Sequence, residues 1–192
     1  MPPADAPPRR VVLLGMMASG KSAVGAALAE RLGWAHVDLD REIERADGRT
    51  VAQIFAAEGE PAFRAMEAEA THRVAARTEV VLSPGGGWIT RAELLDALGP
   101  GTFSVWLRVG VDEAVRRASA APGERPLLAG PDPAGAVRRL LAKREPLYAR
   151  AQLHLTTDGR SVHALADDIH SALRARGLAP VAGASLKTDH GG

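Results

Sequence analysis

One stretch near the start of the chain limits the fold more than any other: a short apolar run, then a glycine-bounded turn, then a helix. Residues 11–14 read Val-Val-Leu-Leu, which is typical of a buried parallel strand. The segment from Gly15 to Ser22 then fits the pattern G-x-x-x-x-G-K-[ST]. Residues 21–32 carry apolar side chains at a spacing of four, which predicts a helix. This order predicts a phosphate-binding turn at the carboxyl edge of a parallel sheet.

The chemistry of the turn points to a nucleoside triphosphate. Gly15 and Gly20 permit a tight backbone path in which successive N–H groups surround an anion at a helix N-terminus. Lys21 is expected to reach the β- and γ-phosphates, and the Ser22 hydroxyl to ligate Mg²⁺. We therefore expect ATP and Mg²⁺ as cofactors. A chance match is the alternative, and the flanking strand and helix argue against it.

Ala18 stands inside the turn, at a position that the general pattern leaves free. A methyl group there is tolerable if φ stays negative. The other residues of the turn that we expect to contact the nucleotide are Ser19 and Ala23.

Strands and helices alternate along the rest of the chain, which predicts an α/β fold with helices on both faces of a parallel sheet. We expect a three-layer α/β/α domain with five strands over residues 11–176, a disordered leader over 1–10 and a mobile tail over 177–192. Thr90 is the expected N-cap of one helix. The further strands are expected at 34–39, 80–82, 102–107 and 153–156, and the further helices at 40–76 (in pieces broken at Gly48 and 59–61), 91–98, 111–118, 134–148 and 161–176.

Composition removes several classes of protein. The 192 residues suit one domain, and the absence of cysteine excludes a disulfide scaffold and a thiol nucleophile. The 24 basic and 23 acidic residues are interspersed and leave a net charge of +1, which argues against a nucleic-acid partner. No apolar run approaches the roughly 18 residues of a membrane span. We expect a cytoplasmic protein, and a monomer because no apolar heptad stripe is evident.

Two carboxylates, Asp38 and Asp40, lie at the end of the second expected strand with one residue between them. In an extended chain they would point to one face, where they need a cation, a hydroxyl donor or a role as base. The alternative is that Asp40 only caps the next helix.

Four further features have a functional and a plain reading. Arg64 and Glu67 share a helix face, and they either bind a ligand or form an ordinary surface ion pair. Gly85, Gly86 and Gly87 let backbone approach a ligand, or form a flexible turn. Arg125 lies in a Gly/Pro-rich segment, where it is either part of a mobile lid that closes over phosphate or a solvated charge in a loop. Arg144 precedes Tyr148 by four residues on a helix, and it either binds a ligand or lies at the edge of the core with its charge in solvent.

Taken in order, these residues resemble the shikimate kinase family over residues 11–176. The resemblance rests on the whole series and not on the phosphate turn alone. The matching segments are Gly15 to Ser22, Asp38-Leu39-Asp40, Gly48-Arg49-Thr50-Val51, Glu58-Gly59-Glu60, Phe63-Arg64, Gly85-Gly86-Gly87, Arg125-Pro126-Leu127-Leu128 and Arg144-Glu145-Pro146-Leu147-Tyr148.

The resemblance implies a P-loop fold like that of the nucleoside monophosphate kinases, and a role for each residue. Asp40, Arg64, Arg144 and the three glycines would hold shikimate, with Asp40 as the base. Asp38 would reach Mg²⁺ through water and complement Ser22. Lys21 and the lid residue Arg125 would stabilise the transferring phosphate, Arg117 and Arg160 would lie near the adenine, and Glu67 would orient Arg64.

The resemblance also divides the domain into an acceptor-binding segment at about 40–75 and a lid at about 118–133. The activity that it implies is phosphate transfer from ATP to the 3-hydroxyl of shikimate, in aromatic amino acid biosynthesis. The other readings are a kinase for another acceptor, such as gluconate or a nucleoside monophosphate, and a nucleotide-binding module without catalysis.

Overall fold

The fold is built on one sheet of five parallel strands. The structure, a computed structural model, describes residues 7–120 and 130–179. The strands lie in the order β2-β3-β1-β4-β5, so the first strand of the chain is central. Their bounds are β1 Arg10–Leu14, β2 Ala35–Asp38, β3 Val80–Ser83, β4 Thr102–Arg108 and β5 Leu153–Thr156. The expected five-stranded parallel sheet is confirmed.

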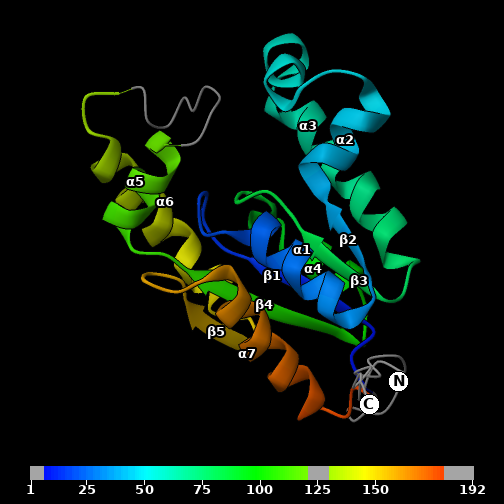
Figure 1. Cartoon of the computed structure of the whole chain (residues 1–192). Coiled ribbons are helices and arrows are strands. Elements are labelled where there is room, and N and C mark those ends of the chain that lie inside the picture. The colour runs from blue at the N-terminus through cyan, green and yellow to red at the C-terminus, as the bar shows by residue number, and fades with distance from the viewer. Residues whose placement is uncertain (1–6, 121–129, 180–192) are drawn as a thin grey trace, which may run out of the picture.

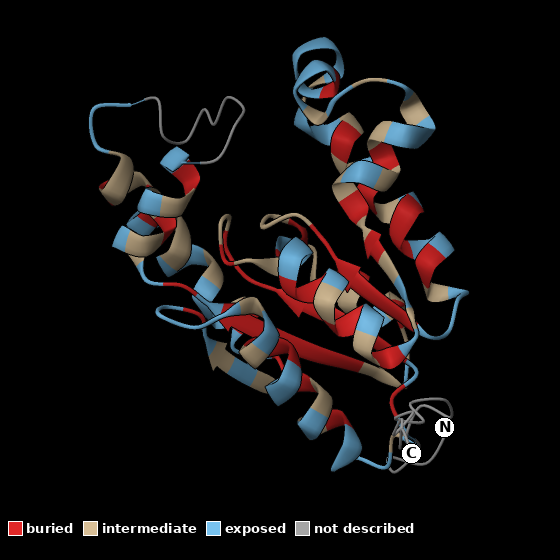
Figure 2. Cartoon of the chain, in the orientation of Figure 1, coloured by how far each residue is buried: buried red, intermediate tan, exposed pale blue. Residues whose placement is uncertain are grey.

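Helices cover both faces of the sheet and make the three layers that the alternation predicts (Figure 1). Val11 and Leu13 of β1 pack toward α1 (Lys21–Leu32) and α7 (Val162–Arg174). Val12 and Leu14 pack toward the opposite face. The three inner strands β3, β1 and β4 are buried on both faces, as their apolar sequences require, whereas the edge strands β2 and β5 stay partly exposed (Figure 2). The other helices are α2 Leu39–Asp47, α3 Val51–Ala75, the 3-10 helix η1 Trp88–Thr90, α4 Ala92–Ala97, α5 Val111–Ala120 and α6 Pro133–Tyr148.

Two pairs of helices extend beyond the carboxyl edge of the sheet, α2 with α3 on one side and α5 with α6 on the other (Figure 1). The expected breaks in the first pair are confirmed. Gly48 ends α2 with φ 85°, and Gly59 interrupts α3 with φ 79° and ψ 177°. Both φ values are positive, and glycine adopts such a backbone at no steric cost because it lacks a Cβ atom. No helix of these described residues is long and apolar enough to cross a membrane.

The helix start predicted at Thr90 is wrong. Thr90 belongs to η1, and α4 begins two residues later with Arg91 as its N-cap. The Thr90 hydroxyl instead donates a hydrogen bond to the carbonyl of Gly87 at 2.7 Å. The reason is burial of Trp88, which pulls the chain after the glycines into a tight turn before a helix can begin.

Arg10 anchors the amino end of the central strand. Its buried guanidinium donates to the carbonyls of Ala75 (2.8 Å), Arg77 (2.6 Å) and Leu98 (2.5 Å). These carbonyls close the C-termini of α3 and α4, where the helix dipole favours a positive charge. One side chain thus ties β1 to two helices.

We expect Arg10→Met to lower the free energy of unfolding by about 3 kcal/mol, because several charge-assisted hydrogen bonds to buried carbonyls are lost together. Urea unfolding measures the change. Arg9→Met, which removes an exposed charge one residue earlier, is the matched control. An equal loss in both variants would show that Arg10 does not anchor the helix ends.

Candidate active site

The turn after β1 has the geometry of a phosphate cradle. Gly15 has φ 147°, and a Cβ atom there would lie 2.5 Å from the Leu107 carbonyl oxygen, so only glycine fits. Gly20 caps α1 with φ 91° and without a side-chain hydrogen bond, which leaves the first N–H groups of the helix for an anion. The Lys21 ammonium donates to the carbonyls of Gly15 and Met16, both at 2.9 Å, and so lies across the turn.

The condition of a negative φ at Ala18 is not met, because the structure gives φ 58°. The loop must curl so that its N–H groups converge, and this path passes through the left-handed region. A residue with a Cβ atom adopts that region at a cost of about 1–2 kcal/mol. The neighbouring Ser19 is buried, and its hydroxyl has no hydrogen-bond partner among the described residues.

Ser22 and Asp38 form a pair of oxygen ligands suited to Mg²⁺. The Ser22 hydroxyl donates to Asp38 Oδ2 at 2.5 Å, at the N-terminus of α1 beside the phosphate cradle. Within 7–120 and 130–179, no three His, Cys, Asp or Glu side chains gather to hold a metal. Mg²⁺ is commonly held by one or two protein ligands together with phosphates and water.

The sequence suggested that Asp38 and Asp40 lie on one extended strand, and the structure shows that they do not. β2 ends at Asp38, which caps α2 by accepting a bond from the Arg41 N–H, and Asp40 lies in the first turn of the helix. The cap is therefore Asp38 and not Asp40. Packing of Leu39 in the core ends the strand there and turns Asp40 toward the glycine loop.

Asp40 sits in a strongly acidic environment. Burial, and then the negative charges of Asp38 and Glu67, raise its pKa to about 6. Its Oδ1 atom is buried and has no hydrogen-bond partner among the residues that the structure describes. Burial makes ionisation of this carboxyl group unfavourable, and no described residue donates a hydrogen bond to its Oδ1 atom. A ligand that donates a hydrogen bond would satisfy this atom.

Arg64 and Glu67 are brought to the same place from α3. The Arg64 guanidinium donates to Glu67 Oε2 at 2.5 Å, and Glu67 is completely buried. Burial raises the pKa of Glu67, and the charge of Arg64 opposes the shift. A Cβ atom at Gly85 would lie 3.1 Å from Asp40 Oδ1 and 3.5 Å from Glu67 Oε1, and one at Gly87 would lie 2.7 Å from the Arg64 guanidinium. The glycine loop therefore lies directly against this cluster.

Gly86 joins the cluster to the phosphate cradle and to α6. A Cβ atom there would lie 3.2 Å from the Met17 nitrogen. Its carbonyl accepts a 2.6 Å hydrogen bond from the buried Tyr148 hydroxyl. Arg144 is one helical turn earlier on α6, and its charge acts on Tyr148, whose pKa burial raises to about 12. The Nε of Arg144 is buried and lacks a hydrogen-bond partner within the described part of the chain.

The two arginines expected near the adenine differ in their surroundings. Arg117 donates to the Thr157 carbonyl at 3.1 Å and to the Ala18 carbonyl at 3.4 Å, so it links α5, the loop after β5 and the cradle. Arg160 instead pairs with Asp168 of α7 at 2.8 Å. Arg125 and most of the expected lid lie outside the described residues.

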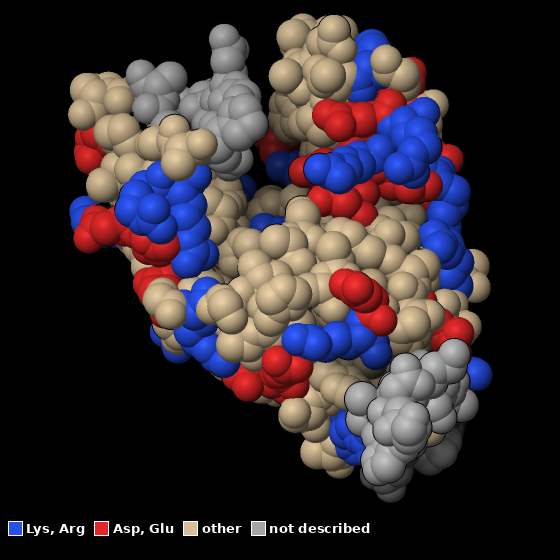
Figure 3. Space-filling model, viewed as in Figure 1, with Lys and Arg blue, Asp and Glu red and all other residues tan. Residues whose placement is uncertain are grey.

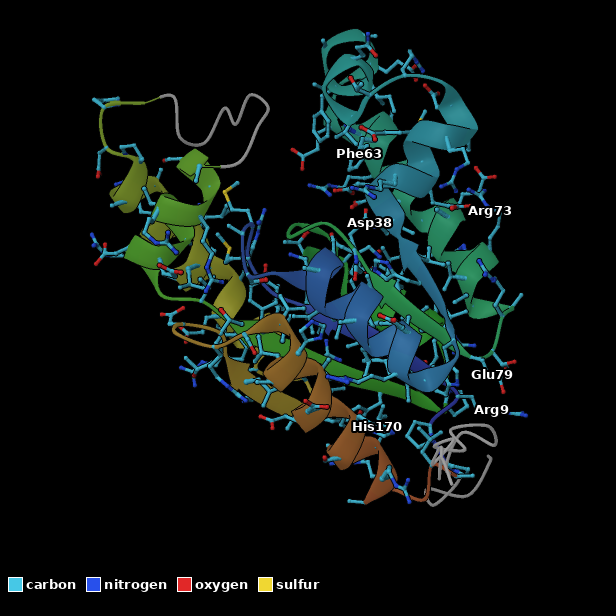
Figure 4. The ribbon with its side chains drawn as sticks, in the orientation of Figure 1. Arg9, Asp38, Phe63, Arg73, Glu79 and His170 are labelled. Carbon is cyan, nitrogen blue, oxygen red and sulfur yellow. The ribbon has the colours of Figure 1, made fainter. Side chains whose placement is uncertain are left out.

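The surface is hollowed between the α2–α3 pair and the α5–α6 pair, and charged atoms of both signs are visible inside the hollow (Figure 3). Asp38 and Phe63 lie on the side of α2 and α3 that faces it (Figure 4). Asp38, which accepts a hydrogen bond from Ser22 beside the cradle, thus borders the hollow at the carboxyl edge of the sheet, where ligands of α/β proteins bind (Figure 4).

Reasoning from the sequence missed two contacts. It did not predict that Tyr148, the single tyrosine of the chain, would bond the Gly86 carbonyl. The spacing of four from Arg144 was a signal that the two share a helix face. It also missed that Glu60 would bond Arg64, although their spacing of four carried the same signal.

We expect Asp40→Asn to stabilise the fold at pH 8 by as much as about 3 kcal/mol, since a pKa raised from 3.8 to about 6 penalises the ionised form. The penalty is complete above pH 6 and absent below the unfolded value, so the gain should vanish near pH 3.5. Urea unfolding at both pH values tests this. Asp47→Asn is the control, because bonding to Arg49 lowers the pKa of Asp47 and its removal should bring no gain. No gain from Asp40→Asn at pH 8 would contradict the prediction.

Comparison with known proteins agrees with this geometry. A family model described as shikimate kinase matches residues 17–174. A shikimate kinase of Symbiobacterium thermophilum is 47% identical over 87% of this chain and 97% of its own length, and one of Moorella thermoacetica is 42% identical over 88% and 96%.

Solved structures show the same relationship. The shikimate kinase from Acinetobacter baumannii in complex with shikimate superposes with a TM-score of 0.82 at 35% identity, covering 90% of this chain and 96% of that one. A gluconokinase from Sinorhizobium meliloti reaches a TM-score of 0.57 at 19% identity, with 88% and 93% covered, which shows a shared fold alone. The chain belongs to the shikimate kinase family.

Proposed function

We propose that the chain transfers the γ-phosphate of ATP to the 3-hydroxyl of shikimate with Asp40 as base and with Arg64 and Arg144 on the acceptor's carboxylate. The products are shikimate 3-phosphate and ADP, and the step belongs to aromatic amino acid biosynthesis. The observation that carries the assignment of roles is the contact of one glycine loop with three groups: Gly85 lies against Asp40, Gly86 against the phosphate cradle and Gly87 against Arg64.

The acceptor carries a carboxylate and hydroxyl groups, and the cluster offers a partner for each. Arg64 is held by Glu67 in one orientation, and a planar guanidinium suits a carboxylate. The unpartnered Nε of Arg144 supports a second contact to the same group. The unpartnered Oδ1 of Asp40 supports a hydrogen bond from a hydroxyl. With a pKa of about 6, Asp40 is ionised at neutral pH and able to take the proton of the attacking hydroxyl.

On the nucleotide side, Gly15, Ala18, Ser19, Gly20 and Ala23 would hold the phosphates mainly through their backbone, and Lys21 would reach the terminal ones. Ser22 would ligate Mg²⁺ directly and Asp38 through water. The ion, when bound, neutralises charge that develops on the transferring phosphate. Arg117 and Arg160 would lie near the adenine, and the contact of Arg117 with the Ala18 carbonyl supports its nearness to the cradle.

The segments would move relative to one another during the reaction. We assign residues 40–75 to acceptor binding and residues 118–133 to a lid that brings Arg125 onto the transferring phosphate. Closure would exclude water, which would otherwise hydrolyse ATP.

We also propose that a single chain works alone in the cytoplasm. Each side chain to which we assign a role comes from one copy, so the site as assigned needs no contribution from a second subunit. A chain without cysteine suits a reducing compartment.

A coupled assay of ADP release with shikimate, ATP and Mg²⁺ tests the acceptor site. We expect Arg64→Ala and Arg144→Ala each to raise the shikimate KM at least tenfold, because a charge-assisted bond to a carboxylate contributes about 1.5–3 kcal/mol. Arg73→Ala is the matched control, since Arg73 pairs with Glu69 elsewhere on α3. A wild-type KM in both variants would overturn the acceptor assignment. Turnover of gluconate in place of shikimate would show that the chain is a kinase for another acceptor.

A separate variant, Tyr148→Phe, tests the support of the glycine loop. The hydroxyl fixes the Gly86 carbonyl, and because the peptide bond is planar and trans it also fixes the direction of the Gly87 N–H. We expect the shikimate KM to rise about three- to tenfold while the ATP KM stays within twofold, as one buried hydrogen bond contributes about 1 kcal/mol. Steady-state kinetics in both substrates measures the split. Equal changes in the two KM values would indicate general loosening of the fold.

A further inference from the structure

Arg64 is already occupied by protein carboxylates, although its proposed task is to bind a carboxylate. Its Nε and Nη2 both donate to Glu60 Oε1, at 3.1 and 2.8 Å, and its Nη1 donates to Glu67 Oε2. Three of the five guanidinium N–H donors are thus engaged. One positive charge faces two negative ones before any substrate arrives.

The two carboxylates differ in how firmly they are held. Glu67 is completely buried in α3 and cannot leave without disrupting the core. Glu60 keeps 64% of its side chain exposed, and among the described residues it bonds no group except Arg64. An exposed ion pair of this kind is weak, so a competing carboxylate can displace it.

The backbone places Glu60 at a break in α3 and not within a regular helix. Gly59 before it has φ 79° and ψ 177°, and Pro61 after it has no N–H to donate. The side of Arg64 that Glu60 covers is the Nε–Nη2 edge, from which a guanidinium can donate two parallel hydrogen bonds to a carboxylate. Glu60 therefore sits on an edge that suits a substrate carboxylate.

We propose that Glu60 is an internal competitor, which occupies Arg64 in the empty site and is replaced there by the carboxylate of the acceptor. The exchange keeps Arg64 oriented and paired while the site is empty, and it lowers the affinity for the acceptor by the free energy of the lost pair. This inference deepens the proposed function and rests on it, since it takes Arg64 as the carboxylate-binding group.

Glu60→Gln tests the exchange, because glutamine keeps the size of the side chain and removes its charge. We expect the dissociation constant of shikimate, measured by calorimetry without nucleotide, and the shikimate KM both to fall about two- to fivefold, the range that an exposed ion pair provides. The ATP KM should stay the same, and the urea midpoint should fall only slightly, because the lost pair stabilises the empty protein by the same small free energy. A merely structural residue would not tighten binding when it is removed.

Two further variants sharpen the result. Glu69→Gln is the matched control: Glu69 forms the same kind of pair with Arg73 at 2.8 Å on the same helix, and Arg73 lies on the outer side of α3, away from Phe63 (Figure 4). It should leave shikimate binding unchanged. Glu60→Asp keeps the charge but shortens the reach to Arg64, so its dissociation constant should fall between those of the wild type and Glu60→Gln.

The outcomes separate this inference from the proposed function. If the wild type phosphorylates shikimate and Glu60→Gln binds it with unchanged or weaker affinity, Glu60 is no competitor, while the proposed function stands. If Glu69→Gln tightens binding equally, the effect is that of overall charge and the inference fails. If the wild type neither binds nor phosphorylates shikimate, both are overturned.

Discussion

The parallel pairing of β1 with β3 is the constraint on which the rest of the site depends. The two strands run side by side in register, Val11 beside Val81 and Val12 beside Leu82. Parallel strands end at the same edge, so the turn after β1 and the glycine loop after β3 emerge next to each other. Gly86 can then approach Met17 so closely that only glycine fits without a shift. The donor and acceptor halves of the kinase meet because two strands pair.

The acceptor side depends on two carboxyl groups whose burial opposes their ionisation. Asp40 and Glu67 are both buried enough that their pKa values rise, and both keep an oxygen without a hydrogen-bond partner among the described residues. Isolated carboxylates of this kind destabilise a fold. Arg64 offsets part of that cost through Glu67, and a bound hydroxyl would offset more. The site thus gives up stability so that its polar atoms remain available to a ligand.

Arg64 connects these features with the further inference. It is packed on Gly87, oriented by the buried Glu67 and covered by the exposed Glu60. A guanidinium that stands in a pocket without a partner would bind any small anion from solution. In our proposal, the weak pair with Glu60 keeps Arg64 bonded while the site is empty and lowers the affinity for the acceptor only slightly. The break in α3 at Gly59 places Glu60 at the exposed side of Arg64, where an acceptor carboxylate can replace it.

Much of the fold and of the site could be predicted from residues alone because both depend on local patterns. The apolar runs and the glycine turns marked the five strands, and residues 21–32 became a helix with the expected bounds. Predictions failed where burial of one side chain overrode a local preference. Trp88 moved the helix start away from Thr90, and Leu39 ended β2 before Asp40. The phosphate cradle holds Ala18 at a φ of 58°, a conformation that the sequence pattern of the turn left open. Local sequence patterns do not reveal such effects, because they depend on contacts between residues far apart in the chain.

What the sequence by itself determined is the chemistry that the chain carries and the order in which it carries it: a phosphate turn with its lysine and serine, two aspartates, three glycines and the arginines. Tertiary structure alone decided which of these groups meet. The hydroxyl of Tyr148 on Gly86, the contact of Asp40 with Gly85 and the hold of Glu60 on Arg64 depend on distances of a few ångströms between side chains. Such distances result from packing of the whole core, whereas spacing along a chain specifies only which residues can share a strand or a helix face.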